Sequence, residues 1–232
     1  MIAVAIDGPA GAGKSTIARR AAKELGFLYA DTGALYRAVG LAVLEKQIAT
    51  DDVASVCDLL NEITVTIVFS QGEQRVMLCG RDVSDEIRSP QVSMAASKVS
   101  AIPEVREFLF TLQRDLAAAN HIVMDGRDIG TVVLPNAQVK IFLTASAEDR
   151  ARRRYEEMVR KGQNADYQDV LADLMQRDYN DTHRTASPLV PAEDSVLVDT
   201  TGNTLEQSVQ ELVSIIKKQL SEKIDGMESV KL

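Results

Sequence analysis

The chain has 232 residues, of which 45% are hydrophobic, 26% charged and 4% aromatic, and its formal net charge is −8 at pH 7. This composition is typical of one soluble globular domain, and no apolar run approaches the roughly 20 residues that span a bilayer. The acidic balance and the absence of Trp argue against a nucleic-acid-binding surface, so an anionic ligand would need a local basic pocket.

The first part of the chain alternates short apolar runs with helical patterns. Residues 2–6 predict a buried strand, and a glycine-rich turn separates it from a helical pattern over 14–25. A second strand is predicted over 27–30 and a second helix over 32–45. Alternating strand and helix units predict an α/β fold, in which helices flank a central parallel sheet.

The middle of the chain follows a different pattern. Apolar residues alternate over 63–69, a turn follows, and 76–79 predicts a partner strand. A hairpin inside an α/β chain indicates an insertion with a small antiparallel sheet, here at about 52–87. Helical patterns resume over 90–119.

The last part of the chain again predicts strands and helices. Ser146 and Asp149 resemble a helix capping box, and the helix that they open carries a run of arginines. The tail over 224–232 lacks a pattern, and we expect it to be flexible. The remaining predicted elements are strands over 122–124, 139–143 and 195–198, and helices over 166–182 and 205–220.

Two cysteines and two histidines offer little for a metal site. Cys57 and Cys79 show no CxxC spacing, and His121 and His183 cluster with neither of them, so we expect no zinc site and no disulfide framework. The N-terminus lacks the basic region and the cleavage site of a signal peptide. We therefore expect a cytoplasmic protein that binds small molecules and neither a membrane nor nucleic acid.

The glycine-rich turn matches the phosphate-binding pattern GxxxxGK[ST] between a predicted strand and a predicted helix. In such a loop backbone N–H groups surround a phosphate, Lys14 reaches the β and γ oxygens of a nucleotide, and Ser15 coordinates Mg²⁺. An incidental glycine turn is the plainer alternative. The predicted nucleotide-binding residues are Gly8, Pro9, Ala10, Gly11, Ala12, Gly13, Lys14, Ser15 and Thr16.

This loop alone leaves a GTPase switch, a motor ATPase and a small-molecule kinase open. We find no NKxD-type guanine-reading motif after a strand, which disfavours the GTPase. Asp125, Gly126, Arg127 and Asp128 follow a central strand at its carboxyl end, where ligands bind in open α/β sheets. We interpret this segment as part of an acceptor site.

Longer motifs make the chain resemble the bacterial cytidylate kinases, within the nucleoside monophosphate kinase group. The motifs are IDGPAGAGKST, DTGALYR, VREFL, DGRDIGTVV, KIFLTAS and QRDYNDTHRTASPL, and the resemblance ends near Lys223. It implies a single P-loop kinase domain over 1–232, with an acceptor-binding insert and a helical lid at about 150–166. The implied reaction is phosphorylation of CMP, and of dCMP, by ATP and Mg²⁺ in a monomer.

The resemblance also implies roles for individual side chains, among which Thr32 stands where family members often have Ser. An Asp acceptor and an Arg donor suit the edge of cytosine, whereas uracil would turn a carbonyl toward the carboxylate. By this resemblance the acceptor phosphate is held by Arg37, Arg127 and Arg184, and the ribose by Arg177 and Asp181. The cytosine is read by Ser97, Arg106 and Asp128, and the pocket is lined by Thr32 and Tyr36. The transferring phosphates are contacted by Arg127 and by the lid residues Arg153 and Arg154.

Plainer interpretations stay open for several of these residues. Ser97 and Arg106 could face solvent on a helix, Asp181 and Arg184 could form an exposed ion pair, and Tyr36 could be core packing alone. The arginine run could be a solvated helix face. Two functional alternatives are a P-loop kinase for UMP, AMP or shikimate and a nucleotide-dependent switch or binding module.

Overall fold

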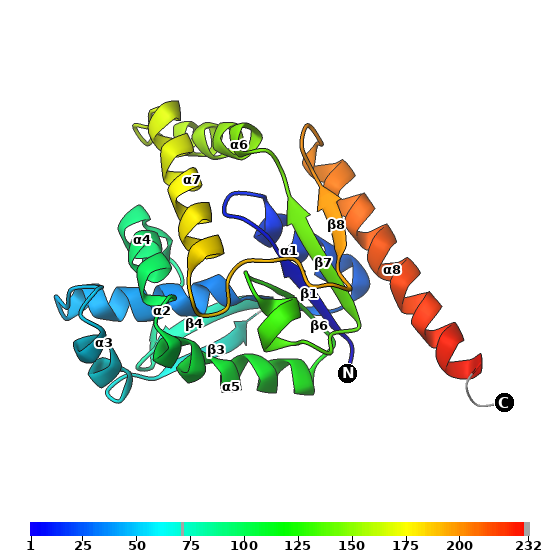
Figure 1. Ribbon diagram of the computed structural model, residues 1–232, viewed down its shortest axis with the longest axis horizontal. Coiled ribbons are helices and arrows are strands. Elements are labelled where there is room, and N and C mark those ends of the chain that lie inside the picture. Colours follow the sequence, from blue (N-terminus) through cyan, green and yellow to red (C-terminus); the bar gives the residue numbers. More distant parts are fainter. Residues whose placement is uncertain (71, 230–232) are drawn as a thin grey trace.

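The structure is a computed structural model, which describes residues 1–70 and 72–229 of the chain. Its main sheet has five parallel strands in the order β2-β6-β1-β7-β8 (Figure 1). The α/β class with a central parallel sheet is therefore confirmed. The strands are β1 (Ala3–Asp7), β2 (Leu28–Asp31), β6 (Ile122–Asp125), β7 (Val139–Thr144) and β8 (Val196–Asp199).

Helices cover both faces of the main sheet. On one face α1 and α8 bury Ile17, Leu212 and Ile216 against the strands. On the other face α5 and a π-helix, η2, pack against Ile122 and Met124. These elements are α1 (Lys14–Leu25), α5 (Pro103–Ala119), η2 (Ile129–Val133) and α8 (Leu205–Ser229).

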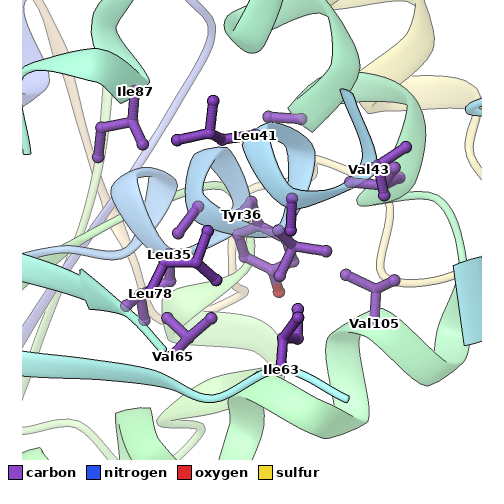
Figure 2. Packing of buried hydrophobic residues seen from close by; sticks show 14 of the residues in the cluster. Leu35, Tyr36, Leu41, Val43, Ile63, Val65, Leu78, Ile87 and Val105 are labelled. Atoms are coloured by element: carbon purple, nitrogen blue, oxygen red, sulfur yellow. The ribbon is translucent and has the colours of Figure 1, made fainter. Parts of the chain in front are cut away.

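A small antiparallel sheet of order β3-β4-β5 confirms the predicted hairpin, although the sequence patterns did not indicate the helix α3 before it. Its apolar side chains share a core with α2, in which Leu35 and Tyr36 pack near Val65 and Leu78 (Figure 2). The insert therefore packs directly on the helix that follows β2. These elements are α2 (Thr32–Glu45), α3 (Val53–Leu60), β3 (Val65–Ser70), β4 (Glu73–Leu78), β5 (Arg81–Asp82) and η1 (Glu86–Arg88); the limits 52–87 of the insert stay a prediction.

The helical patterns over 90–119 form two helices, α4 (Pro90–Val99) and α5. The break comes just before Pro103, because a proline disfavours helical backbone at the residue before it. Helix α4 crosses α2 very closely, since a Cβ atom on Gly40 would lie 2.8 Å from the backbone nitrogen of Ala96. This crossing brings the α4 segment that carries Ser97 against the helix that carries Tyr36 and Arg37.

Helices α6 (Ala147–Arg160) and α7 (Tyr167–His183) pack on each other above the loop between β1 and α1 (Figure 1). Ser146 caps α6 as predicted by accepting a hydrogen bond from the Asp149 N–H at 3.2 Å. Ala10 of the loop joins a small apolar cluster with Ala151, Val170 and Leu174 of the two helices. The segment expected to be a lid therefore lies over the phosphate-binding loop.

The chain ends in the long helix α8, whose backbone continues to Ser229. The flexibility predicted for 224–232 stays a prediction, and residues 230–232 lie outside the described part of the chain. Within that described part, no helix combines the length and the apolar character that crossing a bilayer requires.

Candidate active site

The loop between β1 and α1 is shaped by three glycines with positive φ. Gly8, Gly11 and Gly13 have φ of 147°, 73° and 82°. A Cβ atom on Gly8 would lie 1.9 Å from the carbonyl oxygen of Leu143 on β7, so a larger residue cannot occupy this position. The strand–loop–helix context of the phosphate-binding pattern is confirmed, with the N-terminus of α1 at the carboxyl end of β1.

Lys14 is buried at the start of α1, and its ammonium group turns back onto its own loop. Its Nζ donates to the carbonyl oxygen of Pro9 at 2.7 Å. Burial, and next the positive charge of Arg127, lowers the pKa of Lys14 to about 7, although Asp125 and Asp181 oppose the shift. A cation that is so poorly solvated gains strongly from a nearby anion.

Asp125, at the end of β6, stands beside the residue predicted to bind magnesium. Its Oδ2 accepts from the Ser15 hydroxyl at 2.9 Å and its Oδ1 accepts from the Tyr29 hydroxyl at 2.8 Å. Burial, and next repulsion from Asp31, raises the pKa of Asp125 to about 6. A divalent cation at Ser15 would relieve this unfavourable buried charge, so the residues present fit a magnesium ion.

Two protein groups stand at this corner, the Ser15 hydroxyl and the Asp125 carboxylate. Among the described residues, no group of three or more His, Cys, Asp or Glu side chains could hold a metal ion. Magnesium commonly uses one or two protein ligands and completes its shell with water and phosphate oxygens. The pairing of Ser15 with Asp125 matches that mode of binding.

Asp7 also lies at the end of a strand, but unlike Asp125 it binds backbone N–H groups. Its two oxygens accept the backbone N–H groups of Ile129 at 2.8 Å and Gly130 at 2.7 Å. Its pKa is raised to about 6 by burial, against the effect of these hydrogen bonds. Because both oxygens are engaged by η2, Asp7 holds the segment that follows Asp128 in place.

Two arginines predicted on the acceptor phosphate form close pairs with carboxylates, and a third lies farther from its partners. Arg37 Nη2 donates to Asp31 Oδ2 at 2.7 Å, and Arg127 Nε donates to Asp181 Oδ2 at 2.7 Å. Arg184 Nη1 lies 3.9 Å from Asp181 Oδ1. The carboxylates fix the guanidinium groups and leave other N–H groups of each fork for an anion.

The residues predicted to read the base gather in the interior. Asp128 and Arg106 form a buried ion pair, and Arg184 Nη2 lies 3.7 Å from the other Asp128 oxygen. The Arg106 guanidinium lies over the ring of Tyr36, 5.5 Å from its centroid. Within the described part of the chain, Ser97 Oγ and Arg184 Nη2 are buried without a hydrogen-bond partner. Unpaired buried polar groups beside an ion pair point to a polar ligand.

Burial decides several of the open interpretations. Arg106 is 3% exposed, which excludes a solvent-facing helix position. Asp181 is 7% exposed, so its contact with Arg184 is not a surface ion pair. Tyr36 belongs to the hydrophobic core around α2 (Figure 2). The Arg106 guanidinium also lies over its ring, so core packing is not the only contact that Tyr36 makes. Thr32 donates its hydroxyl to the Asp125 carbonyl at 2.9 Å.

Positive charge accumulates where the acceptor phosphate is expected. Burial, and next the charge of Arg127, lowers the pKa of Arg177 to about 10, and Arg37 and Arg154 lower it further. Arg177 Nε is also buried and has no partner in the described residues. We call Arg37, Arg127, Arg154 and Arg177 the cation cluster. The charges of the other three members act on Arg177 against the opposing charge of Asp181, and a bound anion would relieve the remaining repulsion.

Arg150 on α6 contacts the phosphate-binding loop directly. Its Nη1 donates to the Ala10 carbonyl at 2.7 Å and lies 2.7 Å from Asp178 Oδ2 on α7. The Ala10 N–H donates to Asp178 Oδ1 at 3.1 Å. One ion pair therefore holds both polar groups of a single loop residue and joins the loop to both helices above it.

The structure treats the two predicted lid arginines differently. Arg153 Nη2 donates to the Thr200 carbonyl at 2.6 Å and lies 2.5 Å from Asp149 Oδ2, so it holds α6 to the segment after β8. Arg154 pairs with Glu157 at 3.1 Å and is the one whose charge acts on Arg177. Of these two arginines only Arg154 belongs to the cation cluster, and the lid role of both stays a prediction.

The comparison with known proteins agrees with this geometry. The family model described as cytidylate kinase matches residues 4–218. The chain belongs to the cytidylate kinase family. The cytidylate kinase of Carboxydothermus hydrogenoformans is 52% identical over 213 residues, which cover 92% of this chain and 96% of that protein. The cytidylate kinase of Caldicellulosiruptor saccharolyticus is 48% identical over 223 residues, which cover 96% and 99%.

A solved structure supports the fold of this cytidylate kinase family member. An uncharacterized protein from Eubacterium ventriosum shares 13% identity with it and has a TM-score of 0.52, with 94% of this chain and 99% of that chain covered. At this identity the likeness concerns the fold alone. The family resemblance drawn from the sequence motifs is confirmed by the family match.

Sequence reasoning missed several residues of this cytidylate kinase site. Asp31 could have been found, because an acidic residue just before a helical pattern is a typical N-cap, and its side chain accepts from the Ala34 N–H. Arg150 belongs to the arginine run that the sequence indicated as part of a lid, but no local pattern predicts its contact with Ala10, and Asp178 carries no local signal at all. Their contacts join the phosphate-binding loop to helices more than a hundred residues away in the sequence, so only the folded chain shows them.

Proposed function

We propose that this protein transfers the γ-phosphate of ATP to CMP, and to dCMP, giving ADP and the nucleoside diphosphate. Membership of the cytidylate kinase family supports this reaction, so a kinase for UMP, AMP or shikimate and a nucleotide-dependent switch are not favoured. The observation that carries the proposal is the position of Arg127, which follows β6, is held by Asp181, and lies close enough for its charge to act on both Lys14 of the phosphate-binding loop and Arg177.

On the donor side, the loop over residues 8–16 binds the triphosphate through backbone N–H groups and the N-terminus of α1. Pro9 has no N–H group, and the Ala10 N–H already donates to Asp178, so the other residues of the loop supply these contacts. Lys14 leaves the Pro9 carbonyl and donates to the β and γ oxygens, where negative charge develops during transfer. Ser15 would hold a magnesium ion, with Asp125 behind it, and that ion supplies charge neutralisation at the phosphate oxygens.

On the acceptor side, Arg37, Arg127 and Arg184 hold the phosphate of CMP in line with the donor. That phosphate needs no general base, since its second pKa is about 6 and its oxygen is ionised at neutral pH. Asp128 accepts from the cytosine amino group and Arg106 donates to the ring, which disfavours uracil. Catalysis then rests on positioning and on charge stabilisation by Lys14 and the surrounding arginines.

The sugar and the lid complete the proposed complex. Arg177 and Asp181 bind the ribose, Ser97 contributes to base recognition, and Thr32 with Tyr36 lines the pocket. Closure of the lid over both substrates would exclude the water that otherwise takes the γ-phosphate. Arg153 and Arg154 are the lid arginines that we assign to the transferring phosphates.

We place this enzyme in the cytoplasm as a monomer that acts on small nucleotides and not on nucleic acid. Cys57 and Cys79 are both free thiols, which supports a reducing compartment. Size-exclusion chromatography with light scattering would test the monomer, because a dimer of this 25.3 kDa chain would double the measured mass.

An acceptor panel tests the proposed reaction. ADP release from MgATP is measured with CMP, dCMP, UMP, AMP and shikimate, and without any acceptor. We expect fast release with CMP and dCMP, and slow hydrolysis alone. Equal rates with and without every acceptor would contradict the kinase, and a preference for another acceptor would contradict the choice of CMP.

A further inference from the structure

Ser187 lies in the segment between α7 and β8 and contacts two of the arginines in the acceptor site. Its hydroxyl accepts from Arg106 Nε at 3.2 Å. Its carbonyl accepts from Arg184 Nε at 2.7 Å. One residue therefore binds the inner nitrogen of two guanidinium groups through two different oxygens.

The two arginines meet again at Asp128. Arg106 Nη2 pairs with Asp128 Oδ2, and Arg184 Nη2 lies 3.7 Å from Asp128 Oδ1. With both Nε atoms fixed by Ser187, the outer nitrogens of each fork are directed to the carboxylate that would read the base. The Ser100 carbonyl fixes Arg106 further, at 3.1 Å from Nη1.

The backbone of Ser187 is strained, which indicates that its position is held by these surroundings. Its φ is 51°, in the left-handed region that residues with a side chain rarely adopt. Pro188 follows, and a residue before proline normally prefers extended backbone. The segment closes by a hydrogen bond from the Leu189 N–H to the Asp181 carbonyl at 2.8 Å. Strain of this kind is typical of segments that hold a functional site.

We propose that Ser187 is a positioning residue for base discrimination, acting by holding Arg106 and Arg184 around Asp128. Its hydroxyl fixes Arg106 against rotation, so that Asp128 keeps an oxygen directed at the amino group of cytosine. This inference rests on the proposed function, since it concerns which base the acceptor site selects. In this proposal Ser187 acts through the two arginines and not by a contact of its own with the substrate.

The variants Ser187→Ala and Ser187→Gly separate the hydroxyl from the backbone. Both remove the hydroxyl, but glycine adopts a φ of 51° without strain, so Ser187→Gly retains the fold even if alanine does not. Steady-state kinetics with CMP and with UMP give kcat/KM for each. We expect the CMP-over-UMP ratio to fall about tenfold in both variants, because an unsatisfied N–H on a buried charged group costs about that factor. The KM for ATP should change by less than about twofold.

The matched control is Thr185→Ala, two residues earlier, where the side chain is exposed. It should keep the wild-type ratio. The proposal is overturned if every Ser187 variant that folds keeps that ratio. It is also overturned if both variants fold and only one of them loses the ratio, since the backbone would then be responsible. The wild-type protein is measured first. A wild type that prefers another acceptor contradicts the proposed function, whereas a CMP-selective wild type with unchanged variants contradicts only the role of Ser187.

Discussion

The donor and acceptor sides of the active site use different chemical groups: mainly the backbone on the donor side and side chains on the acceptor side. On the donor side one continuous segment, residues 8–16, presents backbone N–H groups and a single lysine. On the acceptor side the functional groups are side chains from α2, α4, α5, α7 and the end of β6, and most of them are already paired with one another. The two sides therefore prepare for an anion in different ways.

The difference decides what ligand binding must do on each side. At the loop, a phosphate adds contacts to backbone N–H groups, although that of Ala10 already donates to Asp178, and Lys14 exchanges the Pro9 carbonyl. In the acceptor site, a phosphate competes with Asp31 and Asp181 for guanidinium groups that they already bind. Loss of a donor group should therefore affect turnover, whereas loss of an acceptor group should affect one substrate and the stability of the fold.

The largest expected effect is on the donor side. Lys14→Met should lower kcat by about 10²–10³-fold or more, because the lysine acts on charge that develops in the transition state. The fold should stay intact, as measured by circular dichroism. Steady-state kinetics with CMP and MgATP give the rate. Turnover close to that of the wild type would contradict the donor-side mechanism.

On the acceptor side, Asp128→Ala should raise the KM for CMP about 100-fold and leave the KM for ATP within about twofold. The variant removes the partner of Arg106, and breaking a buried ion pair is strongly destabilising. Asp128→Asn, which keeps the volume and one acceptor oxygen, should lose less. Kinetics with each substrate varied in turn measure the difference. Equal losses for CMP and ATP would remove Asp128 from base recognition.

A stability measurement extends the comparison to the protein without ligand. The pKa of Lys14 is lowered in the folded protein to about 7, because charging the buried lysine is unfavourable. The folded protein is therefore most stable above the pKa that the lysine has when unfolded, and this stability is lost as the pH falls toward 7. Lys14→Met should therefore raise the free energy of unfolding near pH 7 by about 1 kcal/mol or more.

Urea denaturation from pH 7 to 9.5 checks this expectation. The gain should shrink by roughly 1 kcal/mol per pH unit as the pH rises, since the wild-type lysine then becomes neutral. Lys23→Met, at an exposed position on the same helix, is the control and should change stability by less than about 0.5 kcal/mol at every pH. A gain that does not depend on pH would show that the buried charge is not its cause.

The smallest expected effect concerns the contact between the insert and the acceptor site. Gln74 on β4 accepts from the Asp31 N–H at 2.7 Å and donates to the Asp31 carbonyl at 3.1 Å. Gln74→Ala should raise the KM for CMP about threefold to tenfold, because Asp31 orients Arg37. The KM for ATP should stay unchanged in this variant. The control Glu73→Ala, on the same hairpin, should leave the KM values for both CMP and ATP unchanged. An equal rise for ATP would mean that the hairpin acts on the whole fold.

The elements that the sequence predicted best have local causes. The ranges predicted for α1 and α2 match the structure residue for residue, since Gly26 ends one helix in the left-handed region and Asp31 caps the start of the other. The α3 helix was missed because its eight residues lie in a segment that was interpreted through the neighbouring hairpin. The π-helix η2 depends on Asp7, which lies 122 and 123 residues before the N–H groups that it binds, so no local pattern predicts it.

The sequence by itself determined the phosphate-binding loop, the central parallel sheet, the hairpin and the family, because each follows from residues that are close together in the chain or from extended motifs. The tertiary structure alone decided which partner each charged group has. Arg106 meets Asp128 and Ser187, and Arg150 meets Ala10, across large sequence separations. The physical reason is that a contact between charged side chains depends on distance and burial in space, and a one-dimensional pattern contains neither.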